Sequence, residues 1–460
     1  MEIRDFIDRE FGGMLECLDR LIRIPSVRSS AEADAPFGKE TRRVLEEVLK
    51  AASEMGFAIR NYENQMGIVD LCGGLEPAIG ILCHADVVPA GAGWIHAPYR
   101  ATLDGDKIYG RGAIDDKGPL VSVLYAMKYL KDFCPPLRHG VRLLIGTDEE
   151  CGSQDLSSYR QQEPLPPIVF TPDAGYPVIN TEKGRAVASF LKTLRPSAPG
   201  KIVESASGGG AVNAVPDRAE ALVSGFSAEE LYAAAARSPA GIRYDFTPES
   251  GGRYRILAAG KSAHASAPGT GENAVTGLIA LLSLIEPDWK EIAALFPHGE
   301  TDGTSLGISC ADSVSGALTA SFDVLSYRAP DFVGTFDIRF PLGQTGAALL
   351  QLLRKTLDAG GFALEGYHAS EPHHTPPDSL LVRTLLSVYE EASGKPAKAL
   401  ATGGGTYAHG IPGAVAFGPE VPGDDNHMHA ADEFIRVSDF KLNTELMIRA
   451  VSRLDEALTF

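Results

Sequence analysis

Hydrophobic and polar residues alternate along the chain with two different periods, and segments of the two kinds are interleaved from the start. Residues 3–26 and 39–56 repeat their apolar positions every three to four residues, which predicts two amphipathic helices, the second ending at Gly56. Residues 57–74 alternate with the period of two that is typical of a pair of strands. Such interleaving predicts an α/β fold in which a mostly parallel central sheet is flanked by helices.

Three apolar runs predict strands that are buried on both faces of this sheet. Each run ends in groups that can bind a metal or move a proton: His84 and Asp86 in residues 78–88, Glu149 and Glu150 in residues 140–150, and Asp173 in residues 168–175. Open α/β sheets place their ligands beyond the carboxyl ends of the strands. For each motif taken alone, the alternatives are a core histidine held by a carboxylate and an acidic corner in solvent.

A glycine-rich turn at residues 109–119 carries two adjacent carboxylates, Asp115 and Asp116, just before a predicted helix at residues 120–130. Glycine permits a tight backbone, and the positive N-terminal end of the helix faces the turn. We expect the turn to present a metal ligand. The alternative is an ordinary helix entry with an aspartate as N-cap.

Two histidines and three carboxylates each come soon after an apolar run or a glycine turn. They are His84, Asp115, Glu150, Asp173 and His429. This ligand set suits zinc, cobalt or manganese. If Asp115 bridges two ions, each ion receives one histidine and one carboxylate of its own, and ions so bridged lie roughly 3.5–4 Å apart in hydrolases. We therefore expect two divalent metal ions, zinc first, with manganese or cobalt as alternatives.

The length of the chain and its local amino-acid composition predict two domains. A chain of 460 residues with 44% hydrophobic residues exceeds one ordinary core. Residues 182–371 are richer in Ala, Ser and Gly, with short alternating strands and a helix at residues 272–286. We expect this segment to be an inserted α+β lid domain, and residues 1–181 and 372–460 to form the catalytic domain.

Charge and cysteine content exclude several classes of protein. Lys+Arg 42 against Asp+Glu 60 gives a net charge of −18, which argues against nucleic acid or anionic membranes as partners. The six cysteines form no CxxC pair, and no signal segment or apolar run of about 20 residues occurs. We expect a cytoplasmic protein.

Nine segments carry a likeness to a known family. They are CHADVVP, YGRGAIDDKGP, GTDEECGS, TPDAGYP, NAVPDRAEA, GKSAHASAPGTGENA, FDIRFP, GGGTYA and HAADE. In this order and spacing the chain resembles the M20 family of metallopeptidases, and within it the dipeptidase PepV-like branch. The resemblance covers nearly the whole chain.

The resemblance implies roles for the residues of the catalytic domain. It implies the same five metal ligands, with Asp115 as the bridge and Asp86 orienting His84. It makes Glu149 the general base that takes a proton from a metal-bridging water and passes it to the leaving amine. It also implies a cis peptide bond after Asp115.

In the lid the resemblance implies three residues that contact the substrate. His264 would donate to the carbonyl oxygen of the tetrahedral intermediate with help from Asn213, and Arg339 would bind the terminal carboxylate. Taken alone, these residues are equally compatible with a structural histidine, a loop asparagine and a surface ion pair. His409 departs from the family pattern, which has an arginine there, so substrate preference can differ.

The first functional hypothesis is a dinuclear-metal dipeptidase acting on small peptides with a free C-terminus. The enlarged lid implies a monomer. The nearest alternative is an N-acyl-amino-acid amidohydrolase or deacylase with the same machinery. A non-enzymatic relative would have lost a ligand or the base, and none is lost here. A nucleotide-binding protein would need G-x-G-x-x-G between a strand and a helix, and the glycine clusters do not match it.

Overall fold

The structure is a computed structural model that describes residues 1–71, 74–194, 200–423 and 425–459. They form two compact units. Unit 1 comprises residues 1–181, 374–400 and 405–460, and unit 2 comprises residues 182–373 and 401–404. The strand pair predicted over residues 57–74 includes residues 72–73, which lie outside the described residues.

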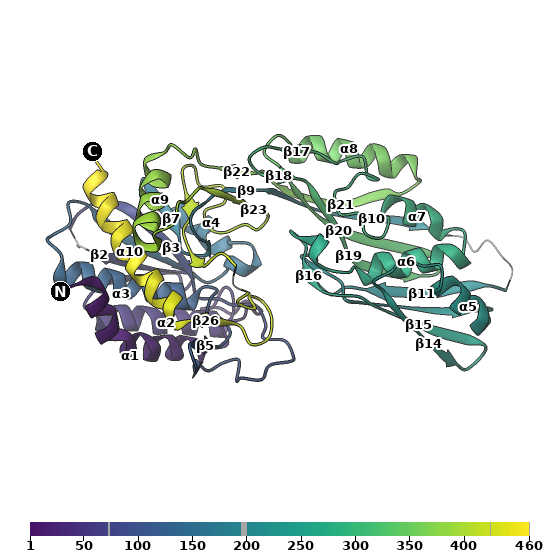
Figure 1. Ribbon diagram of the computed structural model, residues 1–460, viewed down its shortest axis with the longest axis horizontal. Helices are drawn as coiled ribbons and strands as arrows, with labels where there is room; N and C mark the ends of the chain where they lie inside the picture. Colours follow the sequence, from purple (N-terminus) through teal and green to yellow (C-terminus); the bar gives the residue numbers. More distant parts are fainter. Residues whose placement is uncertain (72–73, 195–199, 424, 460) are drawn as a thin grey trace. The chain divides into compact units, whose positions relative to one another are not determined.

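Unit 1 is built around a mixed sheet whose central strands are parallel (Figure 1). In sheet order its strands are β1 (Ala58–Tyr62), β2 (Met66–Leu71), β6 (Gly140–Gly146), β3 (Pro77–His84), β7 (Ile168–Thr171), β24 (Val415–Ala416), β9 (Ile179–Glu182) and β22 (His373–His374), and β23 (Leu400–Thr402) pairs with β9. β6, β3, β7 and β24 pair in parallel, whereas β1, β2 and β6, and also β24 and β9, pair antiparallel. The predicted α/β fold class is confirmed.

Helices cover both faces of this sheet. One hydrophobic core includes residues of α1 (Ile3–Ile22), α2 (Lys39–Glu54), α3 (Lys117–Phe133), α9 (Leu380–Ser393) and α10 (Val437–Ala457), and a smaller core includes residues of α4 (Gln154–Arg160). In β3, Ile79, Ile81 and Cys83 join the first core, and Leu82 joins the second. Because strand side chains alternate between faces, His84 leaves the sheet on the side of Leu82.

In two small sheets of unit 1, strands near the C-terminus pair with strands from earlier in the chain. β25 (Pro419–Glu420) pairs with β8 (Ala174–Gly175), and β26 (Phe434–Arg436) pairs with β5 (Lys107–Tyr109), which also pairs with β4 (Thr102–Asp104). The loop between β25 and β26 is thus fixed at both ends.

Unit 2 is an antiparallel sheet covered by helices on one face (Figure 1). In sheet order its strands are β14 (Arg243–Glu249), β15 (Arg253–Ala259), β13 (Arg218–Ser224), β11 (Ile202–Gly208), β19 (Thr319–Arg328), β20 (Asp331–Phe340), β10 (Gly184–Thr193) and β21 (Ala363–Ser370). Its helices are α5 (Ala228–Ala235), η2 (Pro268–Thr270), α6 (Ala274–Ile285), α7 (Trp289–Leu295) and α8 (Gly346–Ala359), and its short strand pairs are β12 (Ala214–Val215) with β16 (Ala263–His264) and β17 (Ala311–Asp312) with β18 (Gly316–Ala317).

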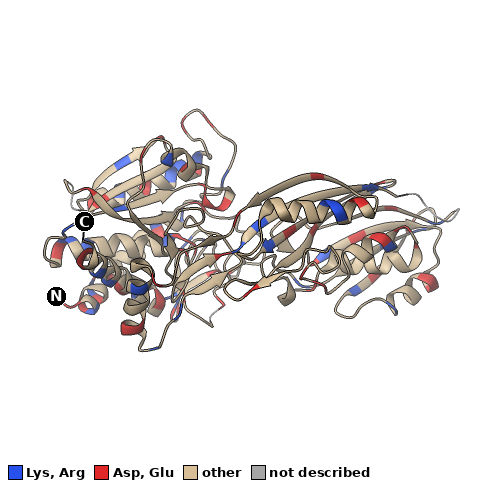
Figure 2. Ribbon diagram, turned by 90° about the horizontal axis from the view of Figure 1, so that it is seen from above, with Lys and Arg blue, Asp and Glu red and all other residues tan. Residues whose placement is uncertain are grey.

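Basic and acidic residues are interspersed on the helices of both units (Figure 2). Between α1 and α2, for example, Arg20 pairs with Glu47 and Glu54. Such exposed pairs contribute at most about 1 kcal/mol each. No helix among the described residues is long and apolar enough to span a bilayer.

Candidate metal centre and substrate-binding groups

The carboxyl ends of three parallel strands bring the predicted metal ligands of unit 1 together. His84 ends β3, the 3-10 helix η1 (Glu149–Cys151) follows β6, and Asp173 follows β7. Asp115 lies in the turn before α3, and His429 in the loop between β25 and β26. The ligand atoms form two groups of three, and within each group all lie within 4.8 Å of one another: His84, Glu149 and Asp173, and Asp115, Glu150 and His429.

Asp115 lies between the two histidines. Its Oδ1 atom is 2.9 Å from His84 Nε2, and its Oδ2 atom is 2.8 Å from His429 Nε2. Beyond them, Asp173 Oδ2 is 3.5 Å from His84 Nε2, and Glu150 Oε1 is 3.2 Å from His429 Nε2. Each oxygen of Asp115 therefore faces a different histidine, as a bridging carboxylate requires.

The charges of these groups fit a site for cations. Burial raises the pKa of Asp173 and of Glu150, and the negative charge of Asp115 raises both further. Burial alone would lower the pKa of His84, but Asp173, Asp115 and Asp86 raise it well above its ordinary value. Clustered buried carboxylates are costly without a positive charge. Two divalent ions would supply that charge to ligands of suitable type, so the residues fit a dinuclear metal centre.

The glycine turn holds Asp115 in place. Gly112 has a φ of 88°, and a Cβ atom there would lie 2.9 Å from Lys117 Cδ and 3.0 Å from Val87 Cγ1. The position therefore needs glycine both for its backbone conformation and for space. The peptide bond between Asp115 and Asp116 is cis, as the family resemblance implies.

A buried glutamate that sequence reasoning missed as a functional residue braces this turn. Glu433 Oε1 accepts hydrogen bonds from the backbone N–H groups of Gly112, at 2.9 Å, and Ile114, at 3.1 Å. Its other oxygen pairs with the guanidinium of Arg111, and both side chains are buried. Glu433 comes from the HAADE segment, so the loop of His429 directly supports the turn of Asp115.

Asp86 organises two neighbouring parts of the centre. Its carboxylate accepts hydrogen bonds from the N–H groups of Glu149 and Glu150, both at 3.2 Å. His84 Nδ1 is 3.0 Å from the backbone oxygen of Asp86 and 3.5 Å from its carboxylate. Asp86 thus orients the ring chiefly through its backbone and the acidic pair through its side chain. Burial raises the pKa of Glu149 well above its ordinary value, and the charges of Asp173 and Glu150 act in the same direction.

Two further residues, to which the sequence assigns no role, make contacts next to the candidate ligands. Asp116 accepts a hydrogen bond from the N–H of His84 at 3.0 Å. Tyr407, from the GGGTYA segment, donates to Asp155 Oδ2 at 2.5 Å, and the same oxygen accepts from the N–H of Thr147 at 2.6 Å. These contacts join segments far apart in the chain, and no local pattern signals them.

In unit 2, Asn213 directly precedes β12, which pairs with β16, the strand that contains His264. Ala214 is the register partner of His264, and the N–H of Ala265 donates to the backbone oxygen of Asn213 at 2.9 Å. Asn213 and His264 are exposed. His264 Nδ1 is 2.6 Å from the hydroxyl of Ser266 and accepts from the N–H of Ser266 at 3.2 Å.

Arg339 is buried, which excludes the surface ion pair considered above; it is 5% exposed. Its Nε is 2.5 Å from Asp337 Oδ1, and its Nη2 is 3.3 Å from Asp337 Oδ2. Nη1 donates to the backbone oxygen of Gly403 at 2.6 Å. Arg339 therefore ties β20 to the glycine segment that precedes Tyr407.

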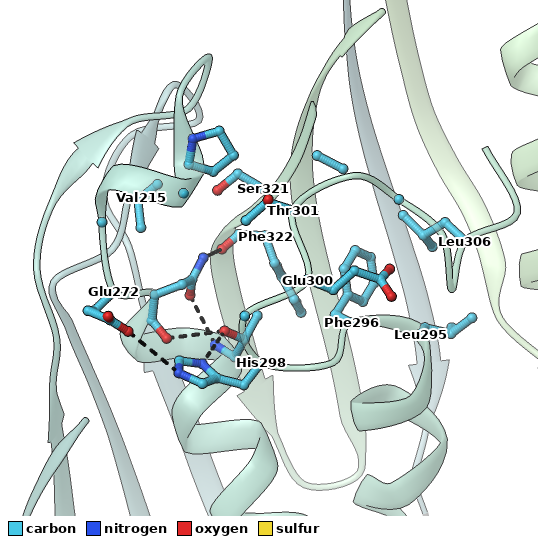
Figure 3. Close-up of a pocket in the computed structure, with 18 residues that line it drawn as sticks. Val215, Glu272, Leu295, Phe296, His298, Glu300, Thr301, Leu306, Ser321 and Phe322 are labelled. Atoms are coloured by element: carbon cyan, nitrogen blue, oxygen red, sulfur yellow. Dashed lines mark hydrogen bonds and ion pairs between the residues drawn. The ribbon is translucent and has the colours of Figure 1, made fainter. Parts of the chain in front are cut away.

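A cavity of about 200 Å³ lies elsewhere in unit 2 (Figure 3). His298 and Glu272 face it, with His298 Nδ1 2.9 Å from Thr276 Oγ1 and Nε2 3.8 Å from Glu272 Oε2. The helix η2 also lines it, a few residues after His264. The residues that line this cavity include none of those predicted for catalysis.

Comparisons with known proteins agree on one family. The model of Peptidase family M20/M25/M40 matches residues 80–453. The chain is 36% identical over 451 residues to "Putative dipeptidase YtjP" of Bacillus subtilis, covering 94% of this chain and 95% of that protein. It is 31% identical over 471 residues to "Beta-Ala-Xaa dipeptidase" of Lactobacillus delbrueckii subsp. lactis, covering 100% of both.

A solved structure shares the fold. The crystal structure of human carnosine dipeptidase 1 matches with a TM-score of 0.61 at 13% identity, covering 99% of each chain. The family match from residue 80 to residue 453 includes every segment of the candidate metal centre, from His84 to His429. The chain belongs to peptidase family M20/M25/M40 and is a hydrolase that acts on peptide bonds.

Proposed function

We propose that this protein is a dipeptidase that uses two divalent metal ions to hydrolyse short peptides with a free C-terminus. The observation that carries the proposal is the row of alternating acids and histidines centred on Asp115, with Glu149 beside it. Two relatives that align over nearly their whole lengths are named as dipeptidases, which supports the same substrate class.

The proposed ligands are His84, Asp115, Glu150, Asp173 and His429, with Asp115 bridging. When bound, the two ions polarise the peptide carbonyl and make water acidic enough to lose a proton near neutral pH. Zinc is the first choice, and manganese and cobalt are compatible with the same ligand types.

The side chains of the protein then perform the proton transfers. Glu149 accepts the proton of the attacking water and delivers it to the leaving amine, because its carboxylate lies among the ligand groups. Asp86 keeps Glu149 in position by accepting its backbone N–H.

Unit 2 is proposed to supply the groups that bind the peptide. His264 donates to the carbonyl oxygen as negative charge develops, and Asn213, in the turn before the neighbouring strand β12, adds a second donor. Arg339 binds the C-terminal carboxylate, which restricts hydrolysis to the end of a peptide. Unit 1 is accordingly the catalytic domain, and unit 2 is the lid.

The proposed setting is the reducing cytoplasm. The cysteines for which the structure describes the thiol, Cys17, Cys83, Cys134, Cys151 and Cys310, are all free. The monomer implied by the enlarged lid stays a prediction, which light scattering of the purified protein would test.

The deciding experiment combines metal analysis with a substrate panel. Protein purified without chelators should contain about two divalent ions per chain and hydrolyse unblocked dipeptides. Matched N-acetyl amino acids serve as the comparison. Faster hydrolysis of the acetylated compounds would reject the dipeptidase proposal in favour of an amidohydrolase.

A further inference from the structure

Two arginines in unit 2 share a single buried carboxylate. Arg185 on β10 and Arg339 on β20 are register partners in the antiparallel sheet, so their side chains lie on one face. Asp337 Oδ2 accepts a hydrogen bond from Arg185 Nε at 2.7 Å, and its Oδ1 accepts one from Arg339 Nε at 2.5 Å. The Asp337 side chain is 0% exposed. We call Arg185, Arg339 and Asp337 the arginine pair and its carboxylate.

The charges of this group are unbalanced. Asp323 is the other carboxyl group nearby, and burial raises its pKa to about 9, so it is uncharged at neutral pH. Ser321 donates to one of its oxygens. Among the described residues, the ion pairs of these two guanidinium groups involve one carboxylate, that of Asp337, so one positive charge is in surplus. A partly buried surplus charge of this kind fits one anionic group from outside.

The two guanidinium groups differ in what they can still bind. Arg339 is enclosed and already donates from Nε, Nη1 and Nη2. The Arg185 side chain is 40% exposed. Among the described residues, its guanidinium donates a hydrogen bond from Nε, to Asp337. The Nη1–Nη2 edge of Arg185 is therefore the open one. That edge carries parallel N–H groups spaced to match the two oxygens of a carboxylate.

We propose that Arg185 is a second carboxylate-binding residue, which receives the C-terminal carboxylate of the substrate together with Arg339. The inference rests on the proposed function and adds a residue to it. Asp337 is the positioning residue, because it holds both guanidinium groups by their Nε atoms and leaves the outer edge of Arg185 free for the substrate. An ion pair with Asp337 for stability alone would need only one arginine.

The test compares a dipeptide with its C-terminal amide in wild type, Arg185→Gln and Arg185→Lys. For Ala-Leu, Arg185→Gln should raise KM roughly 10- to 100-fold, the loss expected for a hydrogen-bonded charge pair, and kcat should stay within about twofold. For Ala-Leu amide, which lacks the carboxylate, the variant and the wild type should be equal within about twofold. Arg185→Lys should recover part of the loss, because it keeps the charge without the fork.

Arg255→Gln is the matched control. Arg255 lies in the same unit, is 45% exposed and pairs with Glu249 and Glu220, so it resembles Arg185 in exposure and in having acidic partners. It should leave both substrates unaffected. An equal loss for peptide and amide in Arg185→Gln would mean a structural role, and no loss for either would mean no role. Each result overturns the proposal.

A binding measurement separates this inference from the proposed function. Calorimetric titration of metal-loaded Glu149→Gln with Ala-Leu and its amide does not depend on turnover. Addition of Arg185→Gln should weaken binding of the acid selectively. If wild type hydrolyses no dipeptide, the proposed function fails, whereas the selectivity of binding still decides the role of Arg185. If it prefers N-acetyl-leucine, the same comparison is made with that acid and its amide.

Discussion

The metal centre of unit 1 and the arginine pair of unit 2 share one geometric device. In each, an aspartate lies between two basic side chains and contacts both of them through its carboxylate oxygens. Asp115 lies between His84 and His429, and Asp337 lies between Arg185 and Arg339. The two clusters nevertheless have opposite chemical consequences.

The difference follows from the pKa of the basic groups. Imidazole can lose its proton near neutral pH and then bind a cation, so histidines beside further acids such as Asp173 and Glu150 form a site for metal ions. Guanidinium keeps its charge at any accessible pH, so two arginines around Asp337 form a site for an anion. The same arrangement is therefore proposed to serve cation binding in unit 1 and anion binding in unit 2.

Removing the first bridge should have the largest effect. Asp115→Ala deletes the group that faces both histidines, so the protein should lose most of its bound metal and nearly all hydrolysis. Metal analysis after gel filtration and assays with excess metal would measure both losses. Full metal content in this variant would contradict the bridging role.

Glu149→Gln should separate chemistry from metal binding. The amide keeps the shape of the side chain but no longer accepts a proton, so kcat should fall by about 100- to 10,000-fold. Metal content should stay near that of the wild type, unlike in Asp115→Ala. A variant that retains the wild-type rate would show that another group is the general base.

Glu433→Gln tests an ion pair of unit 1, between Glu433 and Arg111, in which one negative charge faces one positive charge. Glu433 neutralises Arg111 and holds the turn of Asp115 by its backbone N–H groups. The variant leaves a buried guanidinium without its countercharge, and metal affinity should fall roughly 10- to 100-fold, as for other groups that orient metal ligands. Competition with a chromophoric chelator would measure the affinity. Asp432→Asn is a useful control, because Asp432 instead accepts from the N–H groups of Ile95 and His96.

The sequence predicts those parts of the molecule that local patterns determine. Apolar runs followed by His84, Glu149, Glu150 and Asp173 mark strands whose carboxyl ends meet in a parallel sheet, so the meeting of these side chains follows from fold class. The period of two also places Arg339 on a strand. Each of these strands is predicted from the residues of its own segment.

Two ion pairs between distant segments are not predictable from local sequence patterns. Glu433 and Arg111 are 322 residues apart, and Arg185 reaches Asp337 across 152 residues. Neither arginine differs in its local sequence from an exposed one, because its partner is set by strand order and register. The acidic partner of each arginine is therefore identified only from the three-dimensional structure.

The neutral carboxyl group beside the arginine pair should make the stability of the fold depend on pH. Asp323 keeps its proton in the folded protein up to about pH 9, whereas its ordinary pKa is 3.8. Between these values the unfolded chain binds fewer protons than the folded protein, so the free energy of unfolding falls as pH rises, and the fall ends above about pH 9. Asp323→Asn removes this titration and should flatten the decline.

Urea denaturation of both proteins at about pH 5 and about pH 8 measures the effect, and the variant should lose less stability over this range by a difference on the order of 4 kcal/mol. Asp302→Asn is the control, because hydrogen bonds from Thr304 lower the pKa of Asp302 below 3.8, and that group does not titrate in this range. An equal decline for Asp323→Asn and wild type would mean that Asp323 is ionised when folded. The cluster would then carry two negative charges against two positive ones, and the surplus charge assigned to Arg185 would be absent.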